Sequence, residues 1–220
     1  LFLREGGFPY AIGYGLTETS PLIAGTSVAE TKFRSTGPAI PDVEIKIHEA
    51  DPKTGEGEIW VRGDNVMQEY YRDPERTKQV FVNGWFRTGD LGILDKDGYL
   101  FIKGRLKNVI VGSNGENIYP EEIETILNRA DYVMESLVYE KDGNLCARVH
   151  LDYEELDKEL AVNKLSETQL SEQIKGKLDE LKKMVNANVS AFSRVSKIIE
   201  QQEPFEKTPT KKIKRYLYVE

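Results

Sequence analysis

The sequence predicts an α+β fold, with a β-rich portion over residues 1–106 and a small α/β portion over residues 107–220. Three observations support this division. Between residues 36 and 106, apolar and polar residues alternate at a period of two, with glycine-containing turns between the runs, which is typical of strands. After residue 107, apolar residues also recur at helical spacing. The second portion has about 110 residues, an ordinary domain size.

The composition is that of a chain with a packed core. Of its 220 residues, 39% are hydrophobic and 30% are charged, and the formal net charge is −7. This acidity argues against general binding to nucleic acid, because neutralising phosphates requires clustered cations. The single cysteine, Cys146, excludes an internal disulfide framework and fits a reducing compartment, and the presence of only two histidines argues against a zinc site. No apolar run approaches the roughly 18 residues of a membrane span.

Within the first portion, the pattern predicts a series of short strands. Residues 43–47 alternate strictly, and residues 58–62 do so after a glycine turn. Leu91–Leu94 and Tyr99–Ile102 are expected to form a hairpin around Asp95–Gly98, since Asp and Gly favour tight turns. On this pattern, Asp90 lies just before a strand. The two aspartates of the Asp95–Gly98 turn could suggest a calcium-binding loop, but the twelve-residue spacing of calcium ligands is missing.

The second portion predicts strands and two helices. A short strand over residues 109–111 leads to a helix that begins at Pro120, where proline and three glutamates favour the first turn. A hairpin then follows over residues 133–151. A capping box at Ser166–Gln169 opens a second helix. Its apolar stripe, read as an ordinary core-facing surface, comprises Leu170, Ile174, Leu178, Leu181 and Val185.

The segment Gly13–Glu18 is the first candidate for chemistry. Its glycines allow backbone N–H groups to approach an anion, Thr17 adds a hydroxyl donor and Tyr14 offers a stacking face. The carboxylate of Glu18 could bind Mg²⁺, which commonly takes one or two carboxylates together with substrate phosphates. An ordinary glycine-rich turn explains the segment equally well.

Three further segments carry polar groups in suggestive positions. Asp90 follows a glycine and could accept hydrogen bonds from two ribose hydroxyls, although a turn aspartate bonded to its own backbone is the usual reading. Arg105 could contact ribose or phosphate, and the glycine loop before the Pro120 helix could bind an anion or admit a thin substrate. The basic stretch 207–215 would, by itself, be read as a solvated tail.

Taken together, the order and spacing of these segments resemble the adenylate-forming superfamily, and most closely its long-chain fatty acyl-CoA ligases (AMP-forming). The resemblance covers nearly the whole chain and is strongest over residues 10–127 and 203–216. It implies that residues 1–106 are the β-rich, distorted barrel-like end of a large adenylation domain, and that residues 107–220 are a small mobile C-terminal lid. Since the chain opens with Leu1 inside an apolar stretch, we expect it to be part of a longer protein.

The resemblance also implies roles for individual residues. Tyr14 would pack on adenine, with Gly13 and Gly15 lending backbone. Thr17 would bind the α-phosphate, and Glu18 would hold Mg²⁺. Asp90 would bind the ribose, and Arg105 would contact ribose or phosphate. Lys107 would be the pivot between the two domains. The Ser113–Tyr119 loop, with Gly115, would let pantetheine pass, and Lys212 would be the catalytic lysine.

Two departures from the family pattern are visible. Lys211 stands where the family has glycine, which makes Lys211 an alternative to Lys212; we place the catalytic lysine at 212 because Ile213 and Arg215 follow at the family's spacing. Glu69 replaces another common glycine, with no catalytic effect expected. The family's phosphate loop and most of its acyl pocket would lie upstream of Leu1, so the 220 residues alone are expected to be inactive.

The implied reaction uses ATP and Mg²⁺ to convert a fatty acid to acyl-AMP, and then transfers the acyl group to coenzyme A. Acyl chain length, oligomeric state and peripheral membrane association of a cytoplasmic enzyme are left open. One alternative is transfer to a carrier-protein thiol. Others are a catalytically silent nucleotide-binding module, and a nucleic-acid binder, which the net charge disfavours.

Overall fold

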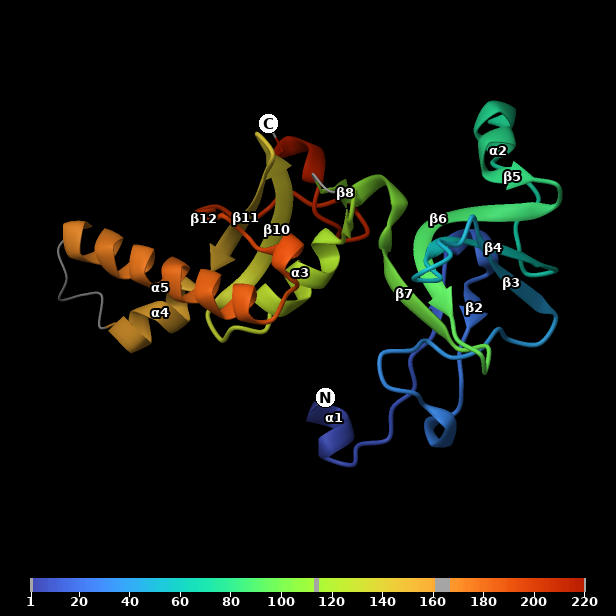
Figure 1. Cartoon of the computed structure of the whole chain (residues 1–220), viewed down its shortest axis with the longest axis horizontal. Helices are drawn as coiled ribbons and strands as arrows, with labels where there is room; N and C mark the ends of the chain where they lie inside the picture. Colours follow the sequence, from blue (N-terminus) through green and yellow to red (C-terminus); the bar gives the residue numbers. More distant parts are fainter. Residues whose placement is uncertain (1, 113–114, 161–166, 220) are drawn as a thin grey trace. The chain divides into compact units, whose positions relative to one another are not determined.

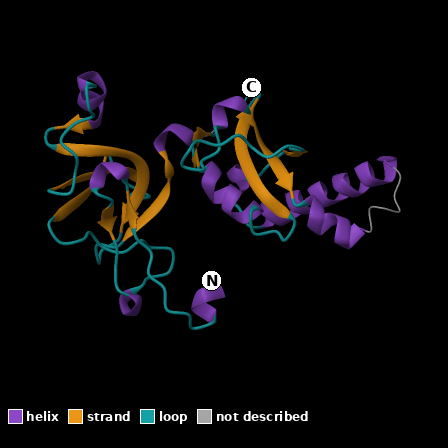
Figure 2. Cartoon of the chain, turned by 180° about the vertical axis from the view of Figure 1, so that it is seen from behind, coloured by secondary structure: helices purple, strands orange, loops and turns teal. Residues whose placement is uncertain are grey.

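The computed structural model describes residues 2–112, 115–160 and 167–219, and the chain divides into two compact units. The first unit is Leu1–Lys107 and the second is Asn108–Glu220 (Figure 1). None of the helices in the described ranges is long and apolar enough to cross a membrane. The α+β class predicted from the sequence is confirmed, with several sheets and short helices in the described chain (Figure 2).

The first unit is built on a five-stranded antiparallel sheet. Its strand order is β3-β4-β6-β5, and β7 pairs with the other end of β6. Within the described residues this sheet stays open and does not close into a barrel. The elements of the unit are α1 (Phe2–Glu5), β1 (Tyr14–Gly15), η1 (Thr17–Thr19), β2 (Leu22–Ala24), η2 (Val28–Glu30), β3 (Val43–His48), β4 (Gly57–Gly63), α2 (Pro74–Val80), β5 (Phe81–Val82), β6 (Trp85–Leu94) and β7 (Leu100–Arg105).

The predicted strands of this unit are confirmed, but the start of β6 differs from the expectation. Asp90 does not precede the strand; it lies within it, since β6 begins at Trp85. The reason is a bulge: Glu58 pairs with Leu91 whereas Trp60 pairs with Arg87, so that β6 carries extra residues opposite β4. Such a bulge lets a glycine and an aspartate, both unusual in strands, sit inside one.

A short connecting segment brings the β1–β2 ribbon to the edge of this sheet. Ala39 forms a bridge with Ala24 at the end of β2, and Gly37 forms one with Leu100 at the start of β7. The core beneath is apolar and closely packed, with Ile23, Ile59 and Leu100 fully buried. The ribbon that carries Tyr14 is therefore fixed on the strand that ends at Arg105.

The second unit has a three-stranded sheet in the order β10-β11-β12, in which β11 and β12 are parallel. The predicted hairpin and the helix at Pro120 are confirmed. The unit's elements are η3 (Leu106–Asn108, at the boundary), β8 (Ile110–Val111), β9 (Asn117–Ile118), α3 (Pro120–Leu127), β10 (Val133–Lys141), β11 (Asn144–Leu151), α4 (Tyr153–Leu160), α5 (Glu167–Ala187), η5 (Ala191–Ser193), β12 (Lys197–Glu200) and η6 (Arg215–Leu217).

Both faces of this sheet are covered. Val138 and Val149 pack with the buried face of α5, which includes Leu181 and Val185 of the predicted stripe. Alternate residues of the strands point to the opposite face, where Leu137 packs with Phe205, Ile213 and Tyr218 of the C-terminal segment. The basic stretch predicted as a solvated tail by its charge alone is thus held against the sheet by its apolar residues. Ser166 of the predicted capping box lies outside the described residues.

Candidate functional site

Asp90 is the centre of a polar cluster in the first unit. Arg105, its pairing partner across β6 and β7, places Nε 2.7 Å from Asp90 Oδ1. Tyr14 of β1 donates its hydroxyl to Asp90 Oδ2 at 2.7 Å. Asp90 is only 5% exposed, so both carboxylate oxygens are engaged in a largely buried setting. Three strands therefore converge on one carboxylate.

The bulge in β6 accounts for the position of Asp90. Thr88 donates its hydroxyl to the Ile59 carbonyl at 2.7 Å and accepts the Asp90 N–H at 3.0 Å. Between them, Gly89 has a φ of +70°, a conformation that glycine adopts without strain. Thr88 thus satisfies the backbone groups that the bulge removes from the ladder, and the Asp90 side chain is held toward Tyr14 and Arg105.

Tyr14 is a neutral hydrogen-bond donor in this cluster. Burial raises the pKa of its phenol, and the negative charge of Asp90 raises that pKa further. Because the neutral form keeps its proton, the hydroxyl can donate to Asp90 over the whole physiological pH range.

The glycines on either side of Tyr14 have a packing requirement of their own. A Cβ atom on Gly15 would lie 1.6 Å from the Pro21 carbonyl oxygen, and one on Gly13 would lie 2.7 Å from Leu22 Cδ1. Close approach of β1 and β2 therefore needs glycine at position 15 whether or not a ligand binds there. Their role in lending backbone to adenine remains a prediction.

Thr17 and Glu18 lie on the short helix η1, which connects the two strands of this ribbon. Thr17 is exposed, and its hydroxyl makes no hydrogen bond to the described residues. Thr19, which is fully buried, accepts the Leu16 N–H at 3.0 Å and lies 2.9 Å from the Pro21 carbonyl oxygen, to which it donates. Buried Thr19 therefore fixes the turn, and its neighbour Thr17 faces solvent.

Glu18 has one oxygen in use. Its Oε1 accepts the hydroxyl of Tyr70 at 2.9 Å, and no hydrogen bond joins Oε2 to any described residue. Among the described residues, no three His, Cys, Asp or Glu side chains gather in a way that could hold a metal ion. Glu18 therefore suits a Mg²⁺ ion that takes its other ligands from phosphates and water, and does not form part of a protein cage.

Sequence reasoning missed Tyr70, Thr19 and Asn65, which support this part of the molecule. Asn65 donates its side-chain amide to the Thr19 carbonyl at 2.9 Å and to the Leu22 carbonyl at 2.7 Å. A lone tyrosine, threonine and asparagine carry no distinctive sequence pattern, so only the fold reveals their contacts.

Lys212 lies in the second unit, on an exposed loop of the C-terminal segment. The Thr208 N–H donates to the Lys212 carbonyl and the Lys211 N–H donates to the Thr208 carbonyl, both at 2.8 Å. Lys207 and Ile213 bridge at the base of this loop. Lys211 therefore lies in the turn at the tip of the loop, and Lys212 follows it, opposite Thr208.

The charges around this tip distinguish its cations. Of five cations in the stretch, three are paired with acids: Lys207 with Glu135, Lys214 with Glu206, and Arg215 with Glu124. Lys211 and Lys212 are exposed and have no ion pair within the described part of the chain. The two lysines between which the sequence left a choice are thus both available.

Lys211 has a φ of +61°, in the left-handed region that favours glycine. The position at which the resembling family has glycine therefore demands glycine's conformation here as well. This backbone geometry supports the alignment that makes Lys212, and not Lys211, the equivalent of the family's lysine.

Arg215 anchors the segment beyond the tip. Its guanidinium lies 2.7 Å from Glu124 Oε1 and also donates to the Val138 carbonyl. Burial raises the pKa of Glu124, while Arg215 and the Val138 N–H act in the opposite direction. Tyr218 packs edge-on against Phe205 at 4.9 Å between ring centroids. The loop's base is thus secured by charge and by aromatic packing.

Two further predicted positions lie between these regions in sequence. Lys107 is exposed in η3 and is the last residue of the first unit. Gly115 has a φ of +85° and donates its N–H to the Gly112 carbonyl at 2.9 Å. Ser113 and Asn114 of the predicted pantetheine loop lie outside the described residues.

The structure therefore unites some of the predicted residues and separates others. Tyr14, Asp90 and Arg105 form one cluster, with Thr17 and Glu18 on the turn that follows Tyr14. Lys212 and Gly115 belong to the other unit.

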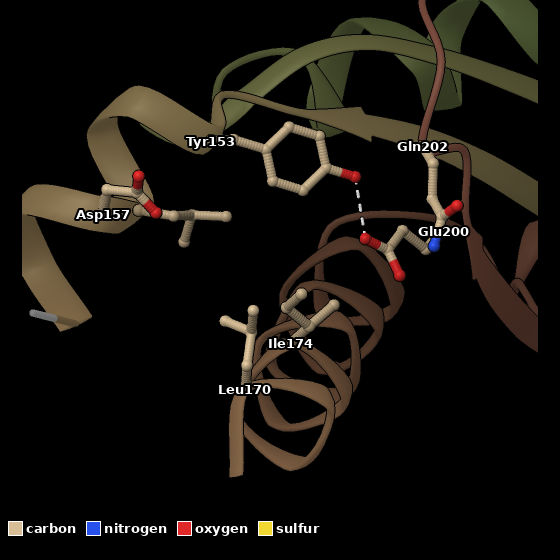
Figure 3. A pocket seen from close by; sticks show the side chains of 7 residues that line it. Tyr153, Asp157, Leu170, Ile174, Glu200 and Gln202 are labelled. Atoms are coloured by element: carbon tan, nitrogen blue, oxygen red, sulfur yellow. Dashed lines mark hydrogen bonds between the residues drawn. The ribbon is translucent and has the colours of Figure 1, made fainter. Parts of the chain in front are cut away.

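The second unit also contains a pocket of about 260 Å³. It is lined by residues of α4 and α5 together with Glu200 and Gln202, and Tyr153 donates its hydroxyl to Glu200 at 2.7 Å (Figure 3). No residue predicted from the sequence to act in catalysis or nucleotide binding lines it.

Known proteins with similar sequences are ligases. The AMP-binding enzyme family matches residues 2–71. The 2-succinylbenzoate–CoA ligase of Bacillus subtilis is 38% identical over 170 residues, which are 74% of this chain and 35% of that protein. The long-chain-fatty-acid–CoA ligase of Haemophilus influenzae is 45% identical over 120 residues, or 52% of this chain and 21% of that protein. An indoleacetate–CoA ligase of Aromatoleum aromaticum is 42% identical over 143 residues, covering 62% of this chain and 28% of the relative.

Solved structures agree. The O-succinylbenzoate coenzyme A synthetase of Bacillus subtilis in complex with its acyl-adenylate intermediate superimposes with a TM-score of 0.78 at 30% identity, covering 98% of this chain and 42% of that one. The same enzyme in complex with ATP and a magnesium ion gives a TM-score of 0.76 at 30% identity, over 97% of this chain and 42% of that one. The chain thus spans less than half the length of these relatives. By sequence and by fold, it belongs to the adenylate-forming superfamily of AMP-binding enzymes.

Proposed function

We propose that the chain is the nucleotide-binding and lysine-bearing part of an AMP-forming long-chain fatty acid–CoA ligase. The observation that carries this proposal is the convergence of Tyr14 and Arg105 on the buried carboxylate of Asp90. A carboxylate has about four acceptor sites, so Asp90 can accept hydrogen bonds from ribose hydroxyls as well as from Tyr14 and Arg105. The relatives that match this chain support a coenzyme A ligase.

The reaction proceeds in two steps. In the first, a fatty acid carboxylate oxygen forms a bond to the α-phosphorus of ATP, the bond to the β-phosphate oxygen breaks, and pyrophosphate leaves. In the second, the coenzyme A thiol gives up its proton and its sulfur attacks the acyl-adenylate carbonyl carbon, and AMP leaves. Residues 2–107 would hold the nucleotide for both steps.

The residues of the first unit would bind and orient. Asp90 and Arg105 would fix the ribose, and Tyr14, which is hydrogen-bonded to Asp90, would pack on adenine. The exposed hydroxyl of Thr17 would donate to the α-phosphate. Glu18 would hold Mg²⁺, which supplies positive charge to the polyphosphate when bound.

Lys212 would act on the first step. Bringing two anions together raises the electrostatic barrier, and a positioned ammonium near the carboxylate and an α-phosphate oxygen lowers it. Its freedom from ion pairs within the described chain fits this role, because a lysine already paired with an acid would have to exchange partners.

Lys212→Ala in the intact protein tests the proposal, with Lys211→Ala as the matched control on the same loop. We expect Lys212→Ala to slow acyl-adenylate formation by about a hundred- to thousand-fold, the usual cost of one preorganised donor. Pyrophosphate release measures this step, and conversion of supplied acyl-adenylate by coenzyme A should be largely retained. Loss of adenylation in Lys211→Ala alone would shift the assignment to Lys211.

An aromatic carboxylic acid is a second candidate substrate. The relatives named for indoleacetate and 2-succinylbenzoate match this chain at 42% and 38% identity, close to the 45% of the fatty acid ligase. Pyrophosphate release with fatty acids of graded length and with arylacetic acids, side by side, distinguishes the two classes. Coenzyme A and a holo-carrier protein, compared as acceptors, test the thiol that receives the acyl group.

A further inference from the structure

The segment Asn65–Tyr70 runs along η1 and contacts it at three levels. Asn65 donates to the Thr19 carbonyl at 2.9 Å, the Met67 N–H donates to the Glu18 carbonyl at 2.8 Å, and the Tyr70 hydroxyl donates to Glu18 Oε1 at 2.9 Å. Both the backbone and the side chain of Glu18 are therefore held by one segment some fifty residues away in sequence.

Tyr70 is itself held by α2. Its N–H donates to Thr77 Oγ1 at 3.0 Å, and the guanidinium of Arg76 lies 4.1 Å from the centroid of its ring. Asp73 caps this helix by accepting the Arg76 N–H at 3.0 Å, and Pro74 occupies its first turn. The helix thus holds Tyr70 at its backbone through Thr77 and at its ring through Arg76.

The phenol of Tyr70 is a donor to a charged acceptor. A tyrosine hydroxyl is protonated at neutral pH and can donate, and here it lies 2.9 Å from Glu18 Oε1. Hydrogen bonds from neutral donors to ionised carboxylates are stronger than those between neutral groups. Oε1 of Glu18 is therefore committed to Tyr70, whereas Oε2 has no hydrogen bond to the described residues.

We propose that Tyr70 is a positioning residue for Glu18, which it orients so that the second carboxylate oxygen is presented to the Mg²⁺ of Mg·ATP. This inference rests on the proposed function, in which Glu18 is the metal-binding carboxylate. Partners that hydrogen-bond to metal-binding carboxylates commonly change metal affinity or activity by about ten- to a hundred-fold when removed. Tyr70 acts through Glu18 and touches neither substrate nor metal in this scheme.

Tyr70→Phe removes only the hydroxyl, and Tyr71→Phe is the matched control, because Tyr71 is the adjacent tyrosine and is 83% exposed. Calorimetric titration of the intact protein with ATP, at a series of Mg²⁺ concentrations, measures binding without turnover. We expect Tyr70→Phe to raise, by about tenfold, the Mg²⁺ concentration at which the Mg²⁺-dependent increase in ATP affinity is half complete. Saturating Mg²⁺ should restore ATP binding to this variant. Tyr71→Phe should leave it unchanged.

A double-mutant cycle with Glu18→Gln separates positioning from a general structural role. If Tyr70 acts through Glu18, then Tyr70→Phe in the Glu18→Gln background should have no further effect on the Mg²⁺ requirement. Additive effects, or a fall in ATP binding that extra Mg²⁺ does not restore, would overturn the inference. Thermal unfolding of each variant shows whether stability alone has changed.

The same cycle distinguishes the inference from the function beneath it. If Glu18→Gln weakens Mg²⁺-dependent ATP binding and Tyr70→Phe does not, the inference is wrong and the proposed role of Glu18 stands. If Glu18→Gln itself leaves the Mg²⁺ requirement unchanged, the metal-binding role of Glu18 is wrong, and the positioning role of Tyr70 is wrong with it.

Discussion

Gly15 shows how closely the candidate site depends on single residues. Its backbone passes so near the Pro21 carbonyl that a Cβ atom would lie 1.6 Å from the oxygen. The neighbour is backbone on a turn that buried Thr19 holds in place, so it cannot yield as the end of a flexible side chain would. The register of Tyr14, and with it the bond to Asp90, depends on this contact.

Gly15→Ala is therefore expected to destabilise the first unit by about 3 kcal/mol, the upper range for overpacking. Both tryptophans, Trp60 and Trp85, belong to this unit, so fluorescence-detected urea unfolding of the chain follows it selectively. Gly25→Ala is the control, because its Cβ would make an ordinary 3.6 Å contact with Leu22. Equal stability of the two variants would contradict this account.

The sequence predicted some residues of the candidate site and not others, for a physical reason. Asp90, Arg105 and Tyr14 stand in segments whose glycines and charges form a distinctive local pattern, and the fold does bring them together. Tyr70 and Asn65 act across gaps of 52 and 46 residues. No local pattern marks such contacts, because they depend on how distant loops cross.

At the level of secondary structure, the sequence predicted those elements whose stabilising contacts lie within a short stretch of the chain. The hairpin at Asp95–Gly98 follows from its turn, in which Asp95 accepts the N–H groups of Asp97 and Tyr99. Strand β12 was not predicted, since it pairs in parallel with β11 only after the long crossover through α5. Helix α2 was also missed, although Asp73-Pro74 is a recognisable start signal.

The β6–β7 hairpin also depends on one half-buried cation. Lys32 pairs with Asp95 and, at 3.1 Å, with Asp97, and this tie connects the turn to the segment that precedes the sheet. The hydrogen bond with Lys32 lowers the pKa of Asp95 from its ordinary 3.8, and that with Asp95 raises the pKa of Lys32 from its ordinary 10.5. The stabilisation is therefore present between those two values, and it is lost below the first and above the second.

Lys32→Gln is expected to lower the stability of the first unit slightly at pH 7. The difference from the unmodified chain should start to shrink as the pH falls below 3.8, should vanish once the pH is below the lowered pKa of Asp95, and should also shrink at high salt. Urea unfolding at pH 7 and at a series of pH values below 3.8 measures it. Lys96→Gln, an exposed lysine in the same turn without an ion pair in the described chain, is the control; a pH-independent loss in Lys32→Gln would argue against this tie.

At the scale of the whole molecule, the division into two units matters most. The cluster of Tyr14, Asp90 and Arg105 lies on the first unit and Lys212 on the second, and the first unit ends at Lys107 within η3. If Lys107 is the pivot that the resemblance implies, a change in a few backbone torsions there would bring different parts of the second unit into use for the two half-reactions.

Lys107→Pro tests the pivot, because proline restricts φ and removes the N–H. In the intact protein we expect thioester formation to fall by about tenfold or more while adenylation changes little. The two half-reactions are measured separately, as pyrophosphate release and as conversion of supplied acyl-adenylate. Lys107→Ala controls for loss of the side chain, and equal losses in both half-reactions would count against a pivot.

The fastening of the C-terminal segment has a practical consequence for spectroscopy. Lys207 and Arg215 secure both sides of the loop through their ion pairs. A spin label attached at Lys211→Cys would therefore move with the second unit and show little local motion of the loop. The native thiol of Cys146 is buried and would react poorly with the label. Dipolar distances from that label to a second label in the first unit would therefore report changes in the arrangement of the two units.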